Sequence, residues 1–215
     1  MRLGSFIVLC GGMLGVLAHA GAATELPPGF PVEEVRRMEE LQAAFHFAPY
    51  TRAQFEQVRT MPSGRVLRSR GTFEFRQGVG MMWRTEAPAR TAMVISPHWL
   101  VVYGSKGQEL RRTDLSRSPV ARYTTIFLNG GSADALQDLT HAFKMTCTQS
   151  AEKLVLGLQA KHEEMDLRML MVEVVKGEVH CVEYQSARQG HTRIQFHAVS
   201  NAQQVPAEPF RILAR

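Results

Sequence analysis

The sequence is poor in cysteine and has no long run of charges of one sign. Three cysteines in 215 residues are too few for a disulfide-stabilised scaffold and too scattered for a structural zinc module. The 25 Lys and Arg residues outnumber the 20 Asp and Glu residues, but those after Arg2 are spread from Arg36 to Arg215 without five like charges in a row. We therefore expect no nucleic-acid partner. The 45% of hydrophobic residues is enough for a globular core.

Motifs of catalysis are also lacking. The sequence has no G-x-S-x-G element, no phosphate-binding loop and no H-E-x-x-H pair. The acidic segment from His162 to Asp166 has no second histidine at helical spacing, so it predicts a solvated loop rather than a metal site. We expect no catalytic residue, no bound metal and no cofactor, and hence a protein that is not an enzyme.

The N-terminal stretch of apolar residues is short. Arg2 is followed by an apolar segment and then by small residues at Ala18, Ala20 and Ala22, which is the pattern of a cleaved secretory signal over residues 1–22. The stretch is short for a membrane-spanning helix of about 20 residues. We expect residues 23–215 to form one exported domain, located in the periplasm of a bacterium.

Two cysteines remain after removal of that segment. Side-chain alternation places Cys147 on an apolar strand face with Phe143 and Met145, and Cys181 on a polar face with Glu183. Cysteines on opposite faces cannot be bridged without movement of the backbone. We predict no disulfide between them.

Periodicity predicts three helices and a long series of strands. A helix over residues 32–46 has one apolar stripe that includes Val35 and Leu41, and a short helix after Pro119 carries Val120, Tyr123 and Phe127 on one face. A further short helix begins near residue 132. The strands are expected at 55–59, 71–76, 81–85, 92–95, 99–103, 143–148, 153–158, 168–175, 179–185 and 191–197. This pattern predicts a mainly β protein with helices (α+β) and an antiparallel sheet.

Some strands are apolar on both faces. Leu154, Leu156 and Leu158 lie on one face of a predicted strand while Val155 lies on the other, and residues 169–172 are continuously apolar. Both faces of this sheet must therefore be covered. We expect the sheet to curl into an incomplete barrel whose concave side is covered by the helices, which act as a plug or lid.

The order of several short motifs resembles the periplasmic lipoprotein carrier family LolA. The similar segments are Phe55-x-Gln57-x-Arg59, Gly71-x-Phe73-x-Phe75, Met82-Trp83-Arg84-Thr85-Glu86-x-Pro88, Val94-Ile95-Ser96 and Gly190-x-Thr192-x-Ile194-x-Phe196. The resemblance is to a divergent branch, and it implies an incomplete antiparallel barrel, a helical lid and an apolar cavity for acyl chains. It also implies an inner-membrane donor complex and an outer-membrane acceptor as partners. We expect a monomer.

The resemblance has one departure. Better-known members carry an Arg-Pro pair, whose arginine helps hold the lid closed, where this sequence has Gln77-Gly78. The cargo is therefore open between a lipoprotein and a smaller lipid. Two other functions are also compatible with the sequence. One is an interaction or sensor module on the same barrel, and the other, less favoured, is a lipid hydrolase.

Cavity and core positions look alike in sequence, so each residue assigned here could equally fill an ordinary core. The residues predicted to line the cavity are Phe55, Phe73, Phe75, Trp83, Val94, Phe143, Met145, Leu154, Leu156 and Leu158. The lid is predicted to contribute Val35, Leu41, Val120, Tyr123 and Phe127.

Overall fold

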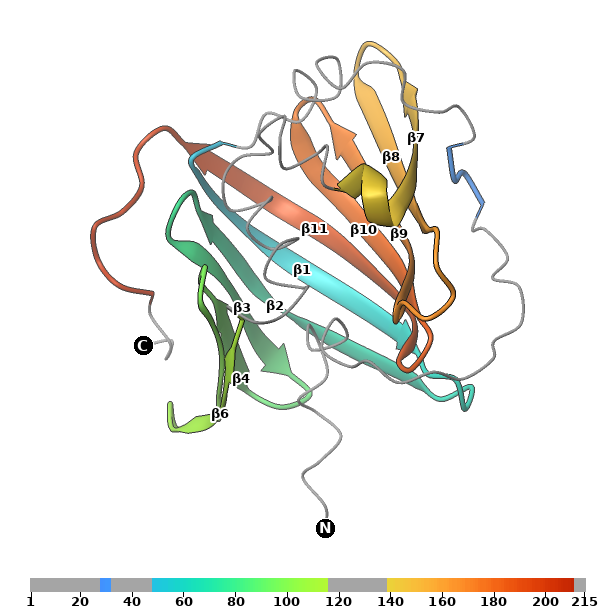
Figure 1. Cartoon of the computed structure of the whole chain (residues 1–215). Coiled ribbons are helices and arrows are strands. Elements are labelled where there is room, and N and C mark those ends of the chain that lie inside the picture. The colour runs from blue at the N-terminus through green and yellow to red at the C-terminus, as the bar shows by residue number, and fades with distance from the viewer. Residues whose placement is uncertain (1–27, 32–47, 116–138, 211–215) are drawn as a thin grey trace.

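The computed structural model describes residues 28–31, 48–115 and 139–210, and these residues form one antiparallel sheet of eleven strands (Figure 1). The strands are β1 (Tyr50–Thr60), β2 (Val66–Arg76), β3 (Gly80–Ala87), β4 (Thr91–Ile95), β5 (Trp99–Tyr103), β6 (Glu109–Asp114), β7 (Phe143–Gln149), β8 (Lys153–Ala160), β9 (Leu167–Val175), β10 (Glu178–Ser186) and β11 (Gly190–Ala202).

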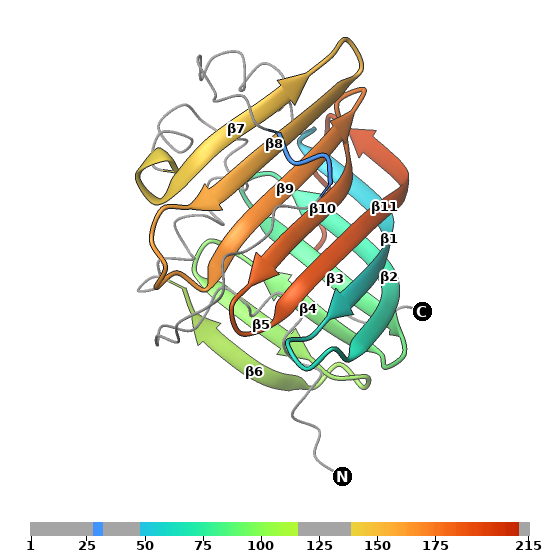
Figure 2. The ribbon, with the colours of Figure 1, turned by 90° about the vertical axis from the view of Figure 1, so that its right-hand side faces the viewer.

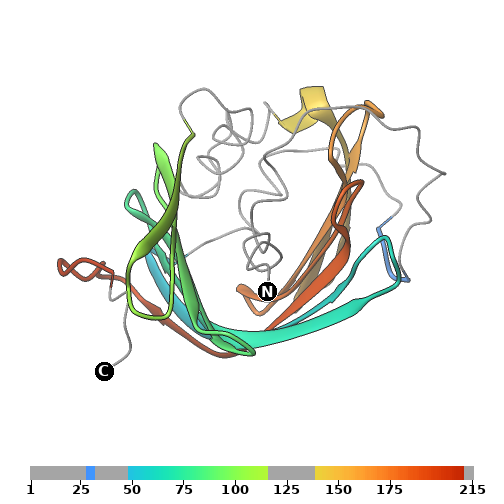
Figure 3. The same cartoon turned by 90° about the horizontal axis from the view of Figure 1, so that it is seen from below.

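The two halves of the chain meet in the middle of this sheet. The spatial order is β6-β5-β4-β3-β2-β1-β11-β10-β9-β8-β7, so the first and last strands pair at the centre (Figure 2). Seen from below, the sheet bends into a trough with one wall from each half (Figure 3). Within the described ranges β6 and β7 are edge strands that do not pair with each other, so the barrel is not closed.

The predicted mainly β, antiparallel fold is confirmed. The residues that were predicted to form the helical lid lie outside the described residues; they are Val35, Leu41, Val120, Tyr123 and Phe127. The described part of the chain contains one helical turn, at residues 139–142, directly before β7.

All ten predicted strands are present, and one strand was not predicted. β6 has the sequence ELRRTD and is largely exposed, so it lacks the apolar alternation that marks a half-buried strand. Gly177 and Gly190 lie where β9 connects to β10 and β10 connects to β11, and both have positive φ. At Gly190 a side chain would also clash, because a Cβ atom would lie 2.1 Å from the Thr60 carbonyl oxygen.

The inner, concave face of the trough carries three apolar clusters. One lies on β7–β10 and includes Phe143 and Leu156, a second lies on β2–β5 and includes Phe75 and Ile95, and the third joins them across β1 and β11. Residues that pair directly across a ladder point to the same face, and cluster members are paired in this way, such as Phe55 with Phe196, Phe75 with Met81 and Leu156 with Val172. The apolar lining of the trough is therefore continuous from wall to wall.

The outer face is covered in two places by segments outside the sheet. The Phe30 ring lies over Gly157 of β8, where a Cβ atom would be 2.6 Å from the ring. On the other wall, buried Arg76 donates hydrogen bonds to the carbonyl oxygens of Pro206 and Glu208 of the C-terminal segment. The expected cover is therefore present on the outer face at these two places, whereas the residues expected to cover the inner face lie outside the described residues.

The two cysteines lie on opposite faces, as predicted. Cys147 packs against the inner cluster of β7–β10, whereas Cys181 is buried on the outer face and pairs across the ladder with Glu173. Neither cysteine is in a disulfide.

Candidate functional site

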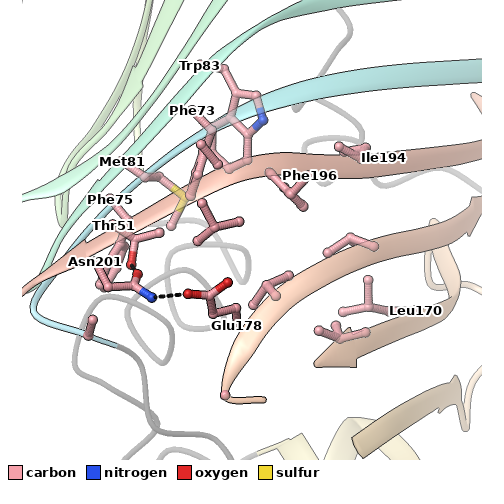
Figure 4. A pocket seen from close by; sticks show the side chains of 17 residues that line it. Thr51, Phe73, Phe75, Met81, Trp83, Leu170, Glu178, Ile194, Phe196 and Asn201 are labelled. Atoms are coloured by element: carbon pink, nitrogen blue, oxygen red, sulfur yellow. Dashed lines mark hydrogen bonds between the residues drawn. The ribbon is translucent and has the colours of Figure 1, made fainter. Parts of the chain in front are cut away.

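The inner face contains an apolar cavity of about 240 Å³ (Figure 4). It lies over the centre of the sheet, between β1–β3 on one side and β9–β11 on the other. A dry apolar cavity of roughly 150 Å³ is enough to bind benzene in another protein, so this one can hold part of a hydrocarbon chain. It is lined by Ala48, Thr51, Ala53, Phe73, Phe75, Met81, Trp83, Leu170, Val172, Gly177, Glu178, Val179, Val182, Ile194, Phe196, Val199 and Asn201.

One side of the cavity is aromatic. Phe73 of β2 pairs across the ladder with Trp83 of β3, and their ring centroids are 4.5 Å apart. The Phe73 ring also meets Phe196 of β11 edge-on, with centroids 5.4 Å apart. Such contacts are worth about 0.5–1.5 kcal/mol each beyond the buried area. The three rings therefore stabilise one another's positions in the cavity wall, and they leave the cavity itself unfilled.

The other side is aliphatic and follows one rung of the sheet. Val172 of β9 pairs with Val182 of β10, which pairs with Ile194 of β11. β-Branched side chains have few rotamers, so this wall is stiff. Leu170 and Val179 extend it along the strands. A surface made of these side chains offers contacts without direction, which suits hydrocarbon rather than a polar ligand.

Polar side chains gather at one end of the cavity. Thr51 Oγ1 donates a hydrogen bond of 2.8 Å to Asn201 Oδ1, and Asn201 Nδ2 donates one of 3.1 Å to Glu178 Oε1 (Figure 4). The ladder pairs Thr51 with Asn201, while Glu178 begins β10 after the turn at Gly177. Glu178 and Asn201 are exposed, so this end of the cavity is in contact with solvent.

The structure brings three of the predicted lining residues, Phe73, Phe75 and Trp83, into the cavity wall. Phe55 is buried beside that wall in the cluster of β1 and β11. Five others are buried in the inner cluster of β7–β10 and are not among the residues that line the cavity: Phe143, Met145, Leu154, Leu156 and Leu158. That these five side chains contact the cargo stays a prediction.

Val94 lies on the other face of the sheet. It pairs with Met82 and Val101, whereas its neighbours Met93 and Ile95 belong to the inner cluster of β2–β5. The reason is the continuous apolar run of β4, in which hydrophobicity alone does not indicate which residues point inward.

Sequence reasoning missed much of the second wall and the polar end. Ile194 and Phe196 alternate with polar residues in β11, and this signal could have identified them. Thr51, Glu178 and Asn201 stand at the ends of three strands, and only the pairing of β1 with β11 brings the first and last together. No local pattern contains that information.

The described residues offer little for catalysis or metal binding. They contain no group of three or more His, Cys, Asp or Glu residues that could hold a metal ion. Asp166, in the segment considered for acid–base chemistry, accepts hydrogen bonds from Ser186 Oγ and the Arg188 amide, so it caps the turn between β10 and β11. Burial raises the pKa of the Cys181 thiol, which disfavours the reactive thiolate.

No helix within the described ranges has the length and hydrophobicity needed to cross a lipid bilayer.

Comparisons with known proteins place the chain in a family. Residues 49–213 match the family described as outer membrane lipoprotein carrier protein LolA. A search of curated proteins gives no match.

Several solved structures are similar at low identity. A LolA superfamily protein from Nitrosomonas europaea is 10% identical, with a TM-score of 0.40 over 81% of this chain and 96% of its own. A putative outer membrane lipoprotein-sorting protein domain from Vibrio parahaemolyticus is 9% identical, with a TM-score of 0.39 over 79% and 93%.

A third structure, the MucA/MucB complex of Pseudomonas aeruginosa, is 16% identical over 80% of this chain and 57% of that chain, with a TM-score of 0.44. The family match extends over all eleven strands of the sheet, including those that line the cavity. The chain therefore belongs to the LolA family of outer membrane lipoprotein carrier proteins.

Proposed function

We propose that this protein is a periplasmic carrier that shelters the acyl chains of a lipoprotein or another lipid in the inner cavity. The observation that carries the proposal is an apolar cavity, walled by Phe73, Trp83 and Phe196, in a chain of the lipoprotein carrier family. The remainder of the apolar trough, including the inner cluster of β7–β10, would receive longer chains when the cargo is bound.

Affinity in this proposal comes from hydrocarbon burial. Each methylene group removed from water contributes about 0.8 kcal/mol, so one long acyl chain binds without specific polar contacts. The same contribution does not depend on the identity of the chain, which allows variable cargo. The catalytic motifs for nucleotide hydrolysis are absent from the sequence, so release requires an acceptor of higher affinity or a conformational change.

The partners follow from the carrier role. The cargo would arrive from a donor complex in the inner membrane and leave to an acceptor at the outer membrane. The signal-like residues 1–22 support export to the periplasm.

The proposal is tested with delipidated protein and a fluorescent fatty acid. A carrier gives saturable binding with one class of site, and native mass spectrometry of the protein purified without delipidation reveals copurified lipid. The absence of both would refute the carrier role. Turnover of a lipid ester in the same preparation would instead establish a hydrolase.

A further inference from the structure

We propose that the polar end of the cavity recognises a primary ammonium group on the cargo, with Glu178 as the residue that receives it. This inference rests on the proposed carrier function, because it assigns the orientation and headgroup chemistry of the same cargo. The acyl chains would lie against Phe73 and Trp83, and the headgroup would lie beside Glu178 at the exposed end.

Charge is the first argument. Among the described residues that line the cavity, Glu178 is the only charged one. Within the described part of the chain, no Lys or Arg nitrogen lies within 4.0 Å of its carboxylate. No cationic side chain of the described residues therefore neutralises its charge, which acts directly on the part of the cargo that occupies this end.

The fixed geometry of the carboxylate is the second argument. Asn201 Nδ2 donates to Oε1 of Glu178, and Asn201 is itself oriented by the hydroxyl of Thr51 (Figure 4). The three side chains come from β10, β11 and β1, so strands at the centre of the sheet hold these two hydrogen bonds in place. Asn201 is a positioning residue here, and it leaves Oε2 of Glu178 as an acceptor for the cargo.

The chemistry of the acceptor selects the headgroup. A carboxylate accepts hydrogen bonds and donates none, so it attracts an ammonium group by charge and hydrogen bonding together. It favours an ammonium group over a carboxylate or an uncompensated phosphate at this end, although a hydrocarbon chain that ends in either still binds through its apolar part. Two kinds of cargo supply a primary ammonium group beside acyl chains, namely an ethanolamine phospholipid and a diacylated lipopeptide with a free terminal amine.

The experiment compares each amine with its blocked form. The four probes are phosphatidylethanolamine, its N-acetyl derivative, a diacylated lipopeptide with a free terminal amine and the same lipopeptide N-acetylated, with acyl chains matched within each pair. Binding to the delipidated full-length protein is measured for the wild type and for Glu178→Gln. Glu163→Gln is the matched control, because Glu163 is equally exposed and does not line the cavity.

The wild type and Glu163→Gln should bind the free-amine member of at least one pair about three- to tenfold more tightly than the blocked member. In Glu178→Gln that ratio should fall to about one, while the affinity for the blocked member stays within about twofold. The pair that shows the preference identifies the source of the ammonium group.

Equal affinity for free and blocked members in the wild type, or an unchanged ratio in Glu178→Gln, would overturn the inference and leave the carrier function standing. Failure of all four probes to bind would overturn the carrier function itself. Asn201→Ala is a second variant, and it should lower the ratio less than Glu178→Gln does, because it removes the positioning contact and keeps the charge.

Discussion

The two faces of the sheet both carry buried side chains, yet they are used differently. On the outer face, Phe30 packs on Gly157, and Arg76 holds the C-terminal segment on the opposite wall. On the inner face, Phe73, Trp83 and Phe196 brace one another around a cavity. The comparison teaches that burial of an apolar residue is not evidence for a role in binding. The role depends on whether other side chains of the same protein fill the space that the residue faces.

The largest expected effect comes from placing a charge on the inner face. Phe73→Asp introduces a carboxylate into the aromatic wall, and bringing hydrocarbon against it strips its water at a cost of several kcal/mol. The affinity for a fluorescent fatty acid should fall on the order of a hundredfold or more. The measurement is a binding titration on protein whose circular dichroism is unchanged.

The matched change on the outer face is Val94→Asp, since Val94 lies on β4, two strands from Phe73, but points away from the cavity. Its affinity for the fatty acid should stay within about twofold of the wild type. Loss of binding in a folded Val94 variant, or normal binding in a folded Phe73 variant, would contradict the assignment of the faces.

The next effect concerns the cover of the outer face. Arg76 is buried, donates from Nε to Glu74 Oε1 at 2.7 Å, and lies 4.4 Å from the centre of the Phe210 ring. Arg76→Met should lower the free energy of unfolding by about 1–3 kcal/mol, because Glu74 and two carbonyl oxygens lose their partner. Chemical denaturation measures this change. Hydrogen exchange should show faster opening of residues 203–210.

Arg65→Met is the control for that change, because Arg65 is exposed in the turn between β1 and β2. It should leave stability within about 0.5 kcal/mol of the wild type. A fatty-acid affinity that drops in Arg76→Met as strongly as in Phe73→Asp would show that the two faces are not independent.

The smallest effect is a pH dependence from Cys181 on the outer face. Burial raises the pKa of this thiol above its ordinary value of 9.0, so the folded chain keeps the proton at pH values where the unfolded chain loses it. The resulting stabilisation is complete below the ordinary pKa and is lost as pH rises through the raised one.

The wild type should therefore lose stability relative to Cys181→Ala above about pH 9, and the difference between the two should be constant from pH 6 to 8. Urea unfolding at each pH measures it. A difference that does not change up to pH 10 would show that Cys181 is solvated in the folded protein.

The sequence predicts most of the sheet because strand alternation and turn glycines are local signals. Gly71 to Phe75 and Gly190 to Phe196 have the period of two that β2 and β11 display. β6 was not predicted, because an exposed edge strand needs no apolar residues. Val94 was assigned to the wrong face because a continuous apolar strand contains no information about its orientation.

The cavity itself was predicted only in part. Phe73, Phe75 and Trp83 follow from the aromatic alternation of β2 and from their ladder partners, whereas Leu158 and Phe143 have the same apolar character and lie in a packed cluster. The difference is set by how side chains from distant strands fit together, and composition does not encode this fit. The polar end depends on a pairing of residues 150 positions apart, Thr51 and Asn201.

The most direct test of the inner cavity uses the two tryptophans of the chain. Trp83 lines the cavity, whereas Trp99 is 40% exposed and stacks beside Arg112, outside the cavity lining. A fatty acid with bromine on its acyl chain quenches a tryptophan that it touches. Trp99→Phe, which keeps Trp83, should lose fluorescence saturably as this lipid is added, and Trp83→Phe, which keeps Trp99, should not. Quenching of Trp99 alone, or of neither tryptophan while the lipid binds, would contradict the claim that hydrocarbon enters the trough.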